Sequence, residues 1–306
     1  MGTVRKRKSR KKDYAHARLW PALFIGPHAI VFALFFLVPA IFGIYISFTS
    51  WSLYDTPQWV GLDNFKELLF DTSSIYHQQL LQGLGATILF VAFTVPLCIA
   101  VPLLIAALLQ HVSGHPRLQK FFQAVFYIPT LFAVSAVMLI WVFLLSLSYG
   151  PLPSWFGLKV NISSTQPWTW VAIIGITVWW CIGQNLIIYV AALGSVPREQ
   201  IEAATIDGAN AWQTFLHVQI PAIRFPLFFT IVTTVIAQFN VYGQPLMLSG
   251  GGPNNSTKVL LMNIQENAFG AGIPAAGISS AMAVILGLCI IAVSAIQFAI
   301  LRRKGD

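Results

Sequence analysis

Charged residues are scarce in this chain of 306 residues. Asp, Glu, Lys and Arg together make up only 9% of it, whereas 57% of the residues are hydrophobic. A soluble domain carries roughly 25% charged residues because its surface faces water. A soluble enzyme, a disordered chain and a nucleic-acid-binding domain are therefore all poor fits. The composition instead predicts a protein whose outer surface faces a lipid bilayer.

The chain also lacks the residues and motifs of several common kinds of site. Its three cysteines, Cys98, Cys181 and Cys289, each lie within an apolar run, so neither a disulfide framework nor a C-x-x-C metal site is expected. The phosphate-binding G-x-x-x-x-G-K-[ST] loop, H-E-x-x-H and G-x-S-x-G are absent. We therefore expect neither an enzymatic site nor a metal or cofactor bound by this chain itself.

Six apolar segments reach the length of about 20 residues that a helix needs to cross a bilayer. They are Trp20–Phe48, Gly85–Gln110, Phe121–Ser146, Trp168–Leu193, Phe225–Val241 and Ala276–Leu301. None carries a charged residue in its central part, where ion-coupled carriers place relay groups. The pattern predicts an all-α membrane protein with one six-helix domain over residues 20–301, a basic tail over 1–19 and a short tail over 302–306.

The basic residues are distributed unevenly between the two sides of these segments. Eight of the 18 Lys and Arg fall within the first 18 residues, and only Lys66, Lys159 and Lys258 lie in the loops that would face outward. Since cytoplasmic loops carry the excess of Lys and Arg, both termini are predicted to be cytoplasmic. The basic tail contributes much of the net charge of +8 and would be attracted to anionic membrane lipid, so the charge does not require a nucleic-acid partner.

The cytoplasmic loop over residues 195–224 has the pattern of two short helices joined at a glycine. The first helix is predicted to begin near Pro197, and Gly208 suits the left-handed conformation that ends many helices. Asn210 and Gln213 form the pattern of a capping box for the second helix, which Pro221 is predicted to end. Taken alone, the loop fits an amphipathic connector on the membrane surface as well as it fits a docking surface for another protein.

The same loop resembles a known family. Glu202-Ala203-Ala204, Gly208 and Val218-x-Ile220-Pro221 resemble the EAA loop of bacterial ATP-binding-cassette importer permeases. The resemblance implies the type I permease fold of these importers. It also implies that the loop couples the membrane helices to two cytoplasmic ATPase subunits, which bind the ATP. The residues assigned to ATPase coupling are Glu202, Ala203, Ala204, Asp207 and Gly208.

A second stretch narrows the resemblance to sugar importers. Phe239-Asn240-Val241-Tyr242, followed by Leu248-Ser249-Gly250-Gly251-Gly252-Pro253 and Thr257, is similar to permeases of the maltose and glycerol-3-phosphate type. Alone, the glycines indicate only a flexible external connector. The resemblance implies a bacterial cytoplasmic-membrane protein with three kinds of partner: a second permease subunit forming a heterodimer, the ATPase pair and an extracytoplasmic solute-binding protein.

Polar and aromatic residues on two of the predicted spans are candidates for a substrate pathway. Trp180 and Gln184 lie four residues apart on the fourth span. Thr234 and Gln238 lie four apart on the fifth, and Asn240 and Tyr242 follow them. Amides and hydroxyls can bond sugar hydroxyls, and aromatic rings can cover the apolar faces of a sugar ring. The alternative is that these groups only hold helices together, as Gln, Asn and Thr often do in membranes.

The predicted function is therefore that of a permease subunit in an ATP-driven carbohydrate importer. An importer of glycerol-3-phosphate or a related polyol phosphate ester is an alternative, although phosphate recognition favours basic residues near the pathway. A self-contained secondary carrier or membrane enzyme is a further alternative. The absence of catalytic motifs and of charge within the spans disfavours it.

Overall fold

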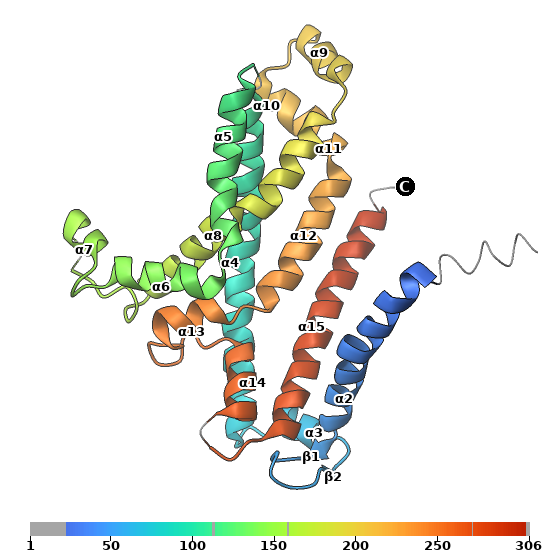
Figure 1. The fold of residues 1–306 in the computed structure, drawn as a ribbon, viewed down its shortest axis with the longest axis vertical. Helices are drawn as coiled ribbons and strands as arrows, with labels where there is room; N and C mark the ends of the chain where they lie inside the picture. The colour runs from blue at the N-terminus through green and yellow to red at the C-terminus, as the bar shows by residue number, and fades with distance from the viewer. Residues whose placement is uncertain (1–22, 112–113, 158, 271, 304–306) are drawn as a thin grey trace, which may run out of the picture.

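The computed structural model describes residues 23–111, 114–157, 159–270 and 272–303 and is mostly helical (Figure 1). Two short strands pair in antiparallel fashion, with Thr49 opposite Trp59. In chain order the elements are η1 (Ala33–Leu37), α2 (Val38–Ile46), β1 (Thr49–Ser50), β2 (Gln58–Trp59), α3 (Asp63–Phe70), α4 (Ile75–His111), α5 (Pro116–Tyr127), η2 (Ile128–Leu131), α6 (Val134–Leu145), α7 (Pro151–Phe156), α8 (Trp168–Gly194), α9 (Arg198–Ile206), α10 (Ala211–Thr214), η3 (Phe215–Gln219), α11 (Ile220–Ala222), α12 (Arg224–Phe239), α13 (Gly243–Ser249), α14 (Leu260–Phe269) and α15 (Ala276–Arg303).

Within the described residues, four unbroken helices are long and apolar enough to cross a membrane, or up to six if each of two bent helix pairs counts as one span. The four are Leu23–Ile46, Ile75–Gln110, Trp168–Gly194 and Ala276–Ile300. They coincide with the first, second, fourth and sixth predicted spans. Helix α4 begins ten residues before the predicted Gly85 and, at 37 residues, is about 55 Å long. This length exceeds the thickness of a hydrocarbon core, which is about 30 Å.

The third predicted span, Phe121–Ser146, is not one straight helix. The chain is helical from Pro116 to Leu131, and then turns by 98° into α6. Phe132 and Ala133 are extended at the turn, where each has a ψ of 144°. Hydropathy predicted an apolar segment of the right length, and the bent pair counts as one span if six are counted. The bend within the segment could not be predicted in this way, because apolar length carries no information on the direction of a helix.

The fifth predicted span, Phe225–Val241, is α12, which begins at Arg224 and ends at Phe239. It follows the helical segment Ala211–Ala222 at an angle of 76°. That segment ends at Ala222, one residue beyond Pro221, close to the end that the sequence predicted. The chain bends at Ile223, where α12 follows.

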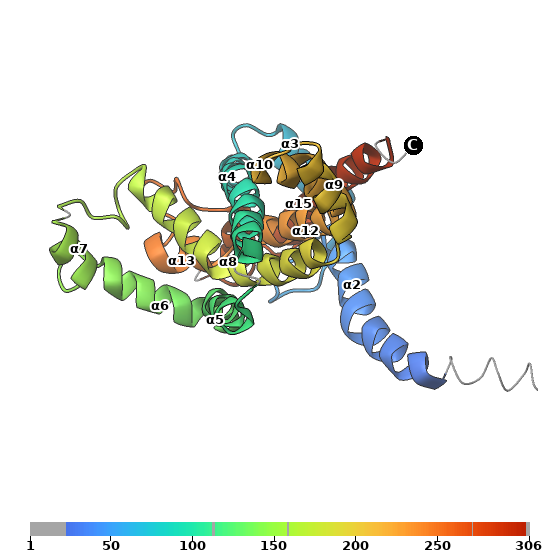
Figure 2. The same ribbon diagram turned by 90° about the horizontal axis from the view of Figure 1, so that it is seen from above.

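Helix α4 lies at the centre of the molecule, and its most extensive packing is against α8. Seen from above, the N-terminal helix and the α6–α7 segment extend from the body on different sides (Figure 2). Large apolar side chains on the N-terminal helix are exposed, such as Phe24 at 77% and Phe35 at 78%. Exposed apolar surface of this extent is unfavourable in water and suits contact with lipid or with another membrane protein.

Polar contacts hold the chain together at the end of the molecule that carries α3, α14 and the two strands. The Asn64 amide donates to the carbonyls of Ser47 and Thr49, both at 2.9 Å. After α3, a hydrogen bond from the Ser73 hydroxyl lowers the pKa of Asp71.

The segment predicted as a flexible external connector does make a turn with positive φ at Gly250 and Gly251, but helices α13 and α14 flank that turn.

Candidate functional site

Helices α8 and α12 are joined by three side-chain contacts at intervals of one turn. The Tyr189 hydroxyl lies 2.6 Å from that of Thr230, the Asn185 amide donates to Thr234 at 3.1 Å, and the Gln238 amide donates to the Cys181 sulfur at 3.9 Å. From one contact to the next, the residue number falls by four on α8 and rises by four on α12, as it must when two helices run antiparallel. These contacts form a polar ladder between α8 and α12, and we use that name for them below.

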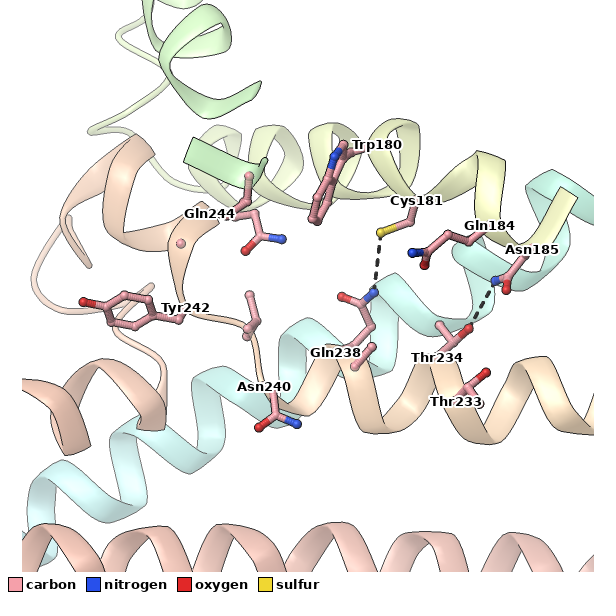
Figure 3. A pocket seen from close by; sticks show the side chains of 14 residues that line it. Trp180, Cys181, Gln184, Asn185, Thr233, Thr234, Gln238, Asn240, Tyr242 and Gln244 are labelled. Atoms are coloured by element: carbon pink, nitrogen blue, oxygen red, sulfur yellow. Dashed lines mark hydrogen bonds between the residues drawn. The ribbon is translucent and has the colours of Figure 1, made fainter. Parts of the chain in front are cut away.

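A cavity of about 470 Å³ opens beside this ladder, between α8, α12 and α13 (Figure 3). It is lined by Val134, Trp180, Cys181, Gln184, Asn185, Thr233, Thr234, Ala237, Gln238, Asn240, Val241, Tyr242, Gly243 and Gln244. None of these residues carries a formal charge. Polar groups come from the amides of Gln184, Asn185, Gln238 and Gln244 and from the hydroxyls of Thr233 and Thr234. The lining therefore offers many neutral hydrogen-bonding groups and no counter-charge for an ion.

All six residues predicted for the pathway lie on this cavity, but they take different positions in it. Figure 3 shows Thr234 and Gln238 pointing toward α8, where they are 7% and 6% exposed. Gln184 is exposed. Asn240 points away from these groups and donates to the Ile236 carbonyl at 2.7 Å, so its amide is occupied by its own helix.

Two aromatic candidates border the cavity. The Trp180 indole nitrogen donates to the Phe132 carbonyl at 3.1 Å, and the Thr130 hydroxyl donates to the Trp180 backbone carbonyl at 2.8 Å. These bonds satisfy a backbone group at the sharp turn between η2 and α6, and they fix that turn against α8. Tyr242 precedes α13, and its ring points away from the α8 side chains (Figure 3).

Some lining residues were not among the six assigned to the pathway from the sequence. Cys181, Asn185 and Gln244 belong to the lining, and Asn185 and Gln244 are buried. The spacing of Cys181, Asn185 and Tyr189 at four-residue intervals was a signal that could have revealed the face of α8 that meets α12. Gln244 follows the fifth span in a stretch predicted as a connector, and no periodicity pointed to it.

The loop over residues 195–224, called the coupling loop below after its predicted role, lies at the end of the molecule opposite α3 and α14 (Figure 1). Helix α9 begins after Pro197, and Gly208 has a φ of +84°, as the sequence predicted for a left-handed helix end. Asn210 and Gln213 form the predicted capping box, with bonds of 2.9 and 2.8 Å.

The five predicted coupling residues lie together at this bend. Glu202, Ala203, Asp207 and Gly208 are exposed, and Ala204 is half-buried. Two apolar side chains beside them are also exposed, Ile206 at 86% and Trp212 at 58%. The base of the loop is buried, because Val196, Phe215 and Ile223 belong to the same hydrophobic cluster as Tyr189 of α8. The loop is thus open at its tip and firmly attached to α8 at its base.

Within the part of the chain that the structure describes, no group of three or more His, Cys, Asp or Glu residues could hold a metal ion. The fold and the cavity together define a multi-pass membrane protein with an uncharged polar site between two of its helices. Residues 104–306 match the family described as the binding-protein-dependent transport system inner membrane component. The chain belongs to this family, and the resemblance seen in its EAA-like loop is confirmed.

Relatives match along nearly the whole chain. The probable starch degradation products transport system permease protein AmyD of Thermoanaerobacterium thermosulfurigenes is 30% identical over 302 residues, which cover 97% of this chain and 98% of AmyD. The sn-glycerol-3-phosphate transport system permease protein UgpA of Escherichia coli (strain UTI89 / UPEC) is 29% identical over 301 residues, with the same two coverages.

A solved structure shares the fold. A chain in the crystal structure of a bacterial alginate ABC transporter, in complex with an alginate pentasaccharide-bound periplasmic protein, superposes with a TM-score of 0.79 at 22% identity. The match covers 97% of this chain and 98% of that chain. The predicted type I permease fold is therefore confirmed.

Proposed function

We propose that this chain is a permease subunit of an ATP-driven, binding-protein-dependent carbohydrate importer, in which it forms half of the translocation pathway. The observation that carries the proposal is the uncharged polar cavity between α8 and α12. A neutral polyol needs hydrogen-bond donors and acceptors but no counter-charge, and burying an unpaired charge in a membrane is costly.

The individual groups of the cavity suit a sugar. The amides of Gln184 and Gln238 can each both donate and accept, as a sugar hydroxyl can. Trp180 supplies an aromatic surface for the apolar face of a ring. AmyD, similar over the whole length, is described as a permease for starch degradation products, and this description supports the same substrate class here.

We further propose that the energy for transport enters through the coupling loop. The exposed tip, with Glu202, Asp207 and the apolar Ile206, would dock on one of two cytoplasmic ATPase subunits, which bind the ATP. An 86% exposed isoleucine is more stable when a partner covers it. The buried base of the loop would pass movement of the ATPase pair to α8, which lines the cavity.

The remaining partners follow from the same proposal. A second permease subunit would form a heterodimer with this chain and complete the pathway. Gln184 is exposed on α8, a helix long and apolar enough to cross a membrane, and lipid cannot satisfy a polar group. An extracytoplasmic solute-binding protein would deliver the sugar. Both termini would lie in the cytoplasm, on the side of the coupling loop.

Glycerol-3-phosphate or a related polyol phosphate ester is the second candidate substrate, favoured by the similarity to UgpA. A phosphate is commonly bound by Arg, Lys or helix N-termini. The cavity lining contains neither Arg nor Lys. We therefore place this candidate second.

Uptake by intact cells tests the proposal. A strain that lacks this gene, and the same strain carrying the gene on a plasmid, are compared for uptake of labelled maltose, maltotriose, other sugars and glycerol-3-phosphate. We expect uptake of at least one sugar to depend on the gene. Uptake restored for glycerol-3-phosphate alone would establish the second candidate, and loss of none of these activities would contradict both.

A further inference from the structure

Helix α4 contains a carbonyl group that its own helix cannot satisfy. Pro102 lies within α4 and has no N–H, so the carbonyl of the residue four positions earlier, Cys98, loses its usual donor. Such a group is costly in a membrane unless a neighbouring helix supplies a donor. Asn185 of α8 does so, with its side-chain nitrogen donating to the Cys98 carbonyl at 2.8 Å. Asn185 therefore replaces the backbone donor that Pro102 lacks.

The same nitrogen also reaches a third helix. It donates to the Thr234 hydroxyl oxygen on α12 at 3.1 Å. An amide nitrogen carries two hydrogens, so both are used, one toward α4 and one toward α12. Because a carbonyl oxygen can only accept, the nitrogen and not the oxygen of Asn185 must face Cys98. Asn185 is only 7% exposed, so its orientation is fixed by contacts to two helices besides its own.

This orientation decides what the cavity offers to a ligand. The Thr234 oxygen accepts from Asn185, and no acceptor among the described residues takes up the Thr234 hydroxyl hydrogen. The Asn185 side-chain oxygen likewise receives no donor within the described part of the chain. Both residues line the cavity. A donor and an acceptor therefore stand next to each other, and one hydroxyl group of a ligand can both donate and accept.

We infer that Asn185 is a positioning residue for the substrate: while it completes the proline-interrupted helix α4, it holds Thr234 as a hydrogen-bond donor at the cavity. This inference rests on the proposed function for the identity of the ligand, but not for the link between Pro102 and Asn185. Of the other two contacts of the polar ladder, Tyr189–Thr230 makes no hydrogen bond to α4 among the described residues, whereas Cys181 also contacts the side chain of Cys98 on α4. Among the bonds of the described residues, the Cys98 carbonyl itself is bonded by the side chain of Asn185 and by neither of these pairs.

A double-mutant cycle tests the link to the proline. In Pro102→Ala the amide of residue 102 can bond the Cys98 carbonyl, so the donor from Asn185 is no longer needed there. We expect Asn185→Ala to lower the thermal midpoint of the purified whole transporter clearly in the native background and much less in the Pro102→Ala background. Pro96→Ala is the matched control, since this second proline of α4 has no relation to Cys98. An equal loss in all three backgrounds would overturn the proline link.

The positioning role is tested in the same variants by transport kinetics. The whole transporter in liposomes, with its ATPase and binding-protein partners, is assayed with labelled maltose or the sugar that the uptake panel identifies. In the Pro102→Ala background, we expect Asn185→Ala to raise KM roughly fivefold with kcat retained, the effect of one misdirected neutral hydrogen bond. A KM unchanged by Asn185→Ala would show that Asn185 is structural only.

The two hypotheses fail in distinguishable ways. If the transporter moves no sugar, the proposed function and the positioning role both fail, and the stability cycle still decides the link between Pro102 and Asn185. If sugar is transported but KM does not respond to Asn185, the proposed function stands and the positioning role is rejected.

Discussion

At the scale of single residues, close packing at one glycine brings α5 against α8. A Cβ atom on Gly183 would lie 2.6 Å from the Thr130 hydroxyl and 2.7 Å from the Tyr127 Cα. Since the second neighbour is backbone, a side chain could fit only if the two helices moved apart. The small residue therefore allows the approach on which the hydrogen bonds between Thr130, Trp180 and the turn before α6 depend.

We expect Gly183→Ala to destabilise the assembled transporter by about 1–3 kcal/mol, the usual effect of overpacking. Unfolding of the purified complex in denaturing detergent measures the change. Gly175→Ala is the matched control, because it lies on the same helix with nothing within 4 Å of its Cβ position. Equal effects of the two substitutions would contradict the close-approach explanation.

Gln184 is the cavity residue whose side chain is best placed to meet a ligand, because it is exposed and makes no hydrogen bond to other described residues. We expect Gln184→Ala to raise KM for the transported sugar about fivefold, the loss of one hydrogen bond of ~1 kcal/mol. Uptake kinetics at equal membrane expression measure it. The exposed Gln265 of α14 lies outside the cavity lining, and Gln265→Ala should leave KM unchanged. A matching rise in both variants would argue against direct contact by Gln184.

The candidate site was predictable from sequence at residue scale only in part. The neutral amides and hydroxyls on two apolar segments indicated a polar site within the membrane. The sequence alone could not distinguish a cavity-facing amide from one that joins helices. Asn185 and Thr234 turn out to bond each other across α8 and α12, whereas Gln184, one residue away, is exposed. That difference depends on how the two helices are rotated against each other, which periodicity on one helix does not determine.

At the scale of elements, the bend between α9 and α10 depends on Gly208. Its φ of +84° lies in the region that favours glycine, and nothing within 4 Å crowds its Cβ position. The obstacle to substitution is therefore backbone conformation and not space. Proline fixes φ near −65°, so Gly208→Pro cannot retain this bend.

We predict that Gly208→Pro and Glu202→Lys abolish uptake while the protein still inserts into the membrane. Glycine removal changes the shape of the tip, and Glu202→Lys reverses a charge that would pair with a basic group on the ATPase. Uptake and immunodetection in membrane fractions measure the two properties. Gln200→Lys, which adds a charge roughly 200° around α9 from Glu202, serves as the control and should transport normally. Normal transport by Gly208→Pro or Glu202→Lys would refute the coupling role.

The elements themselves were predicted unequally well. The capping box at Asn210, the left-handed Gly208 and four of the six apolar helices followed from local patterns that act over one or two turns. The turn at Phe132 and Ala133 did not, because it is held by contacts with Trp180, about 50 residues further along the chain. Features stabilised by distant parts of the chain leave little trace in the local sequence.

At the scale of the whole molecule, the distribution of basic residues between its two ends indicates how the protein is oriented in the membrane. Arg198 and Arg224 begin α9 and α12 at the coupling-loop end, while Lys66 of α3 and Lys258 before α14 belong to the opposite end (Figure 1). Lys258 is paired with Glu266 of α14, which partly offsets its charge. The excess of unpaired positive charge at the coupling-loop end is the arrangement that cytoplasmic loops carry.

Labelling of single introduced cysteines by a membrane-impermeant maleimide tests this orientation. Thr72→Cys lies in the exposed turn between α3 and α4, and Gln200→Cys lies on exposed α9. If α9 faces the cytoplasm, Thr72→Cys is labelled in intact spheroplasts and Gln200→Cys only after the membrane is permeabilised. The parental chain gives the background from Cys98, Cys181 and Cys289, none of which is exposed. Labelling of Gln200→Cys in intact spheroplasts would place the loop outside, where no ATP-driven partner could reach it.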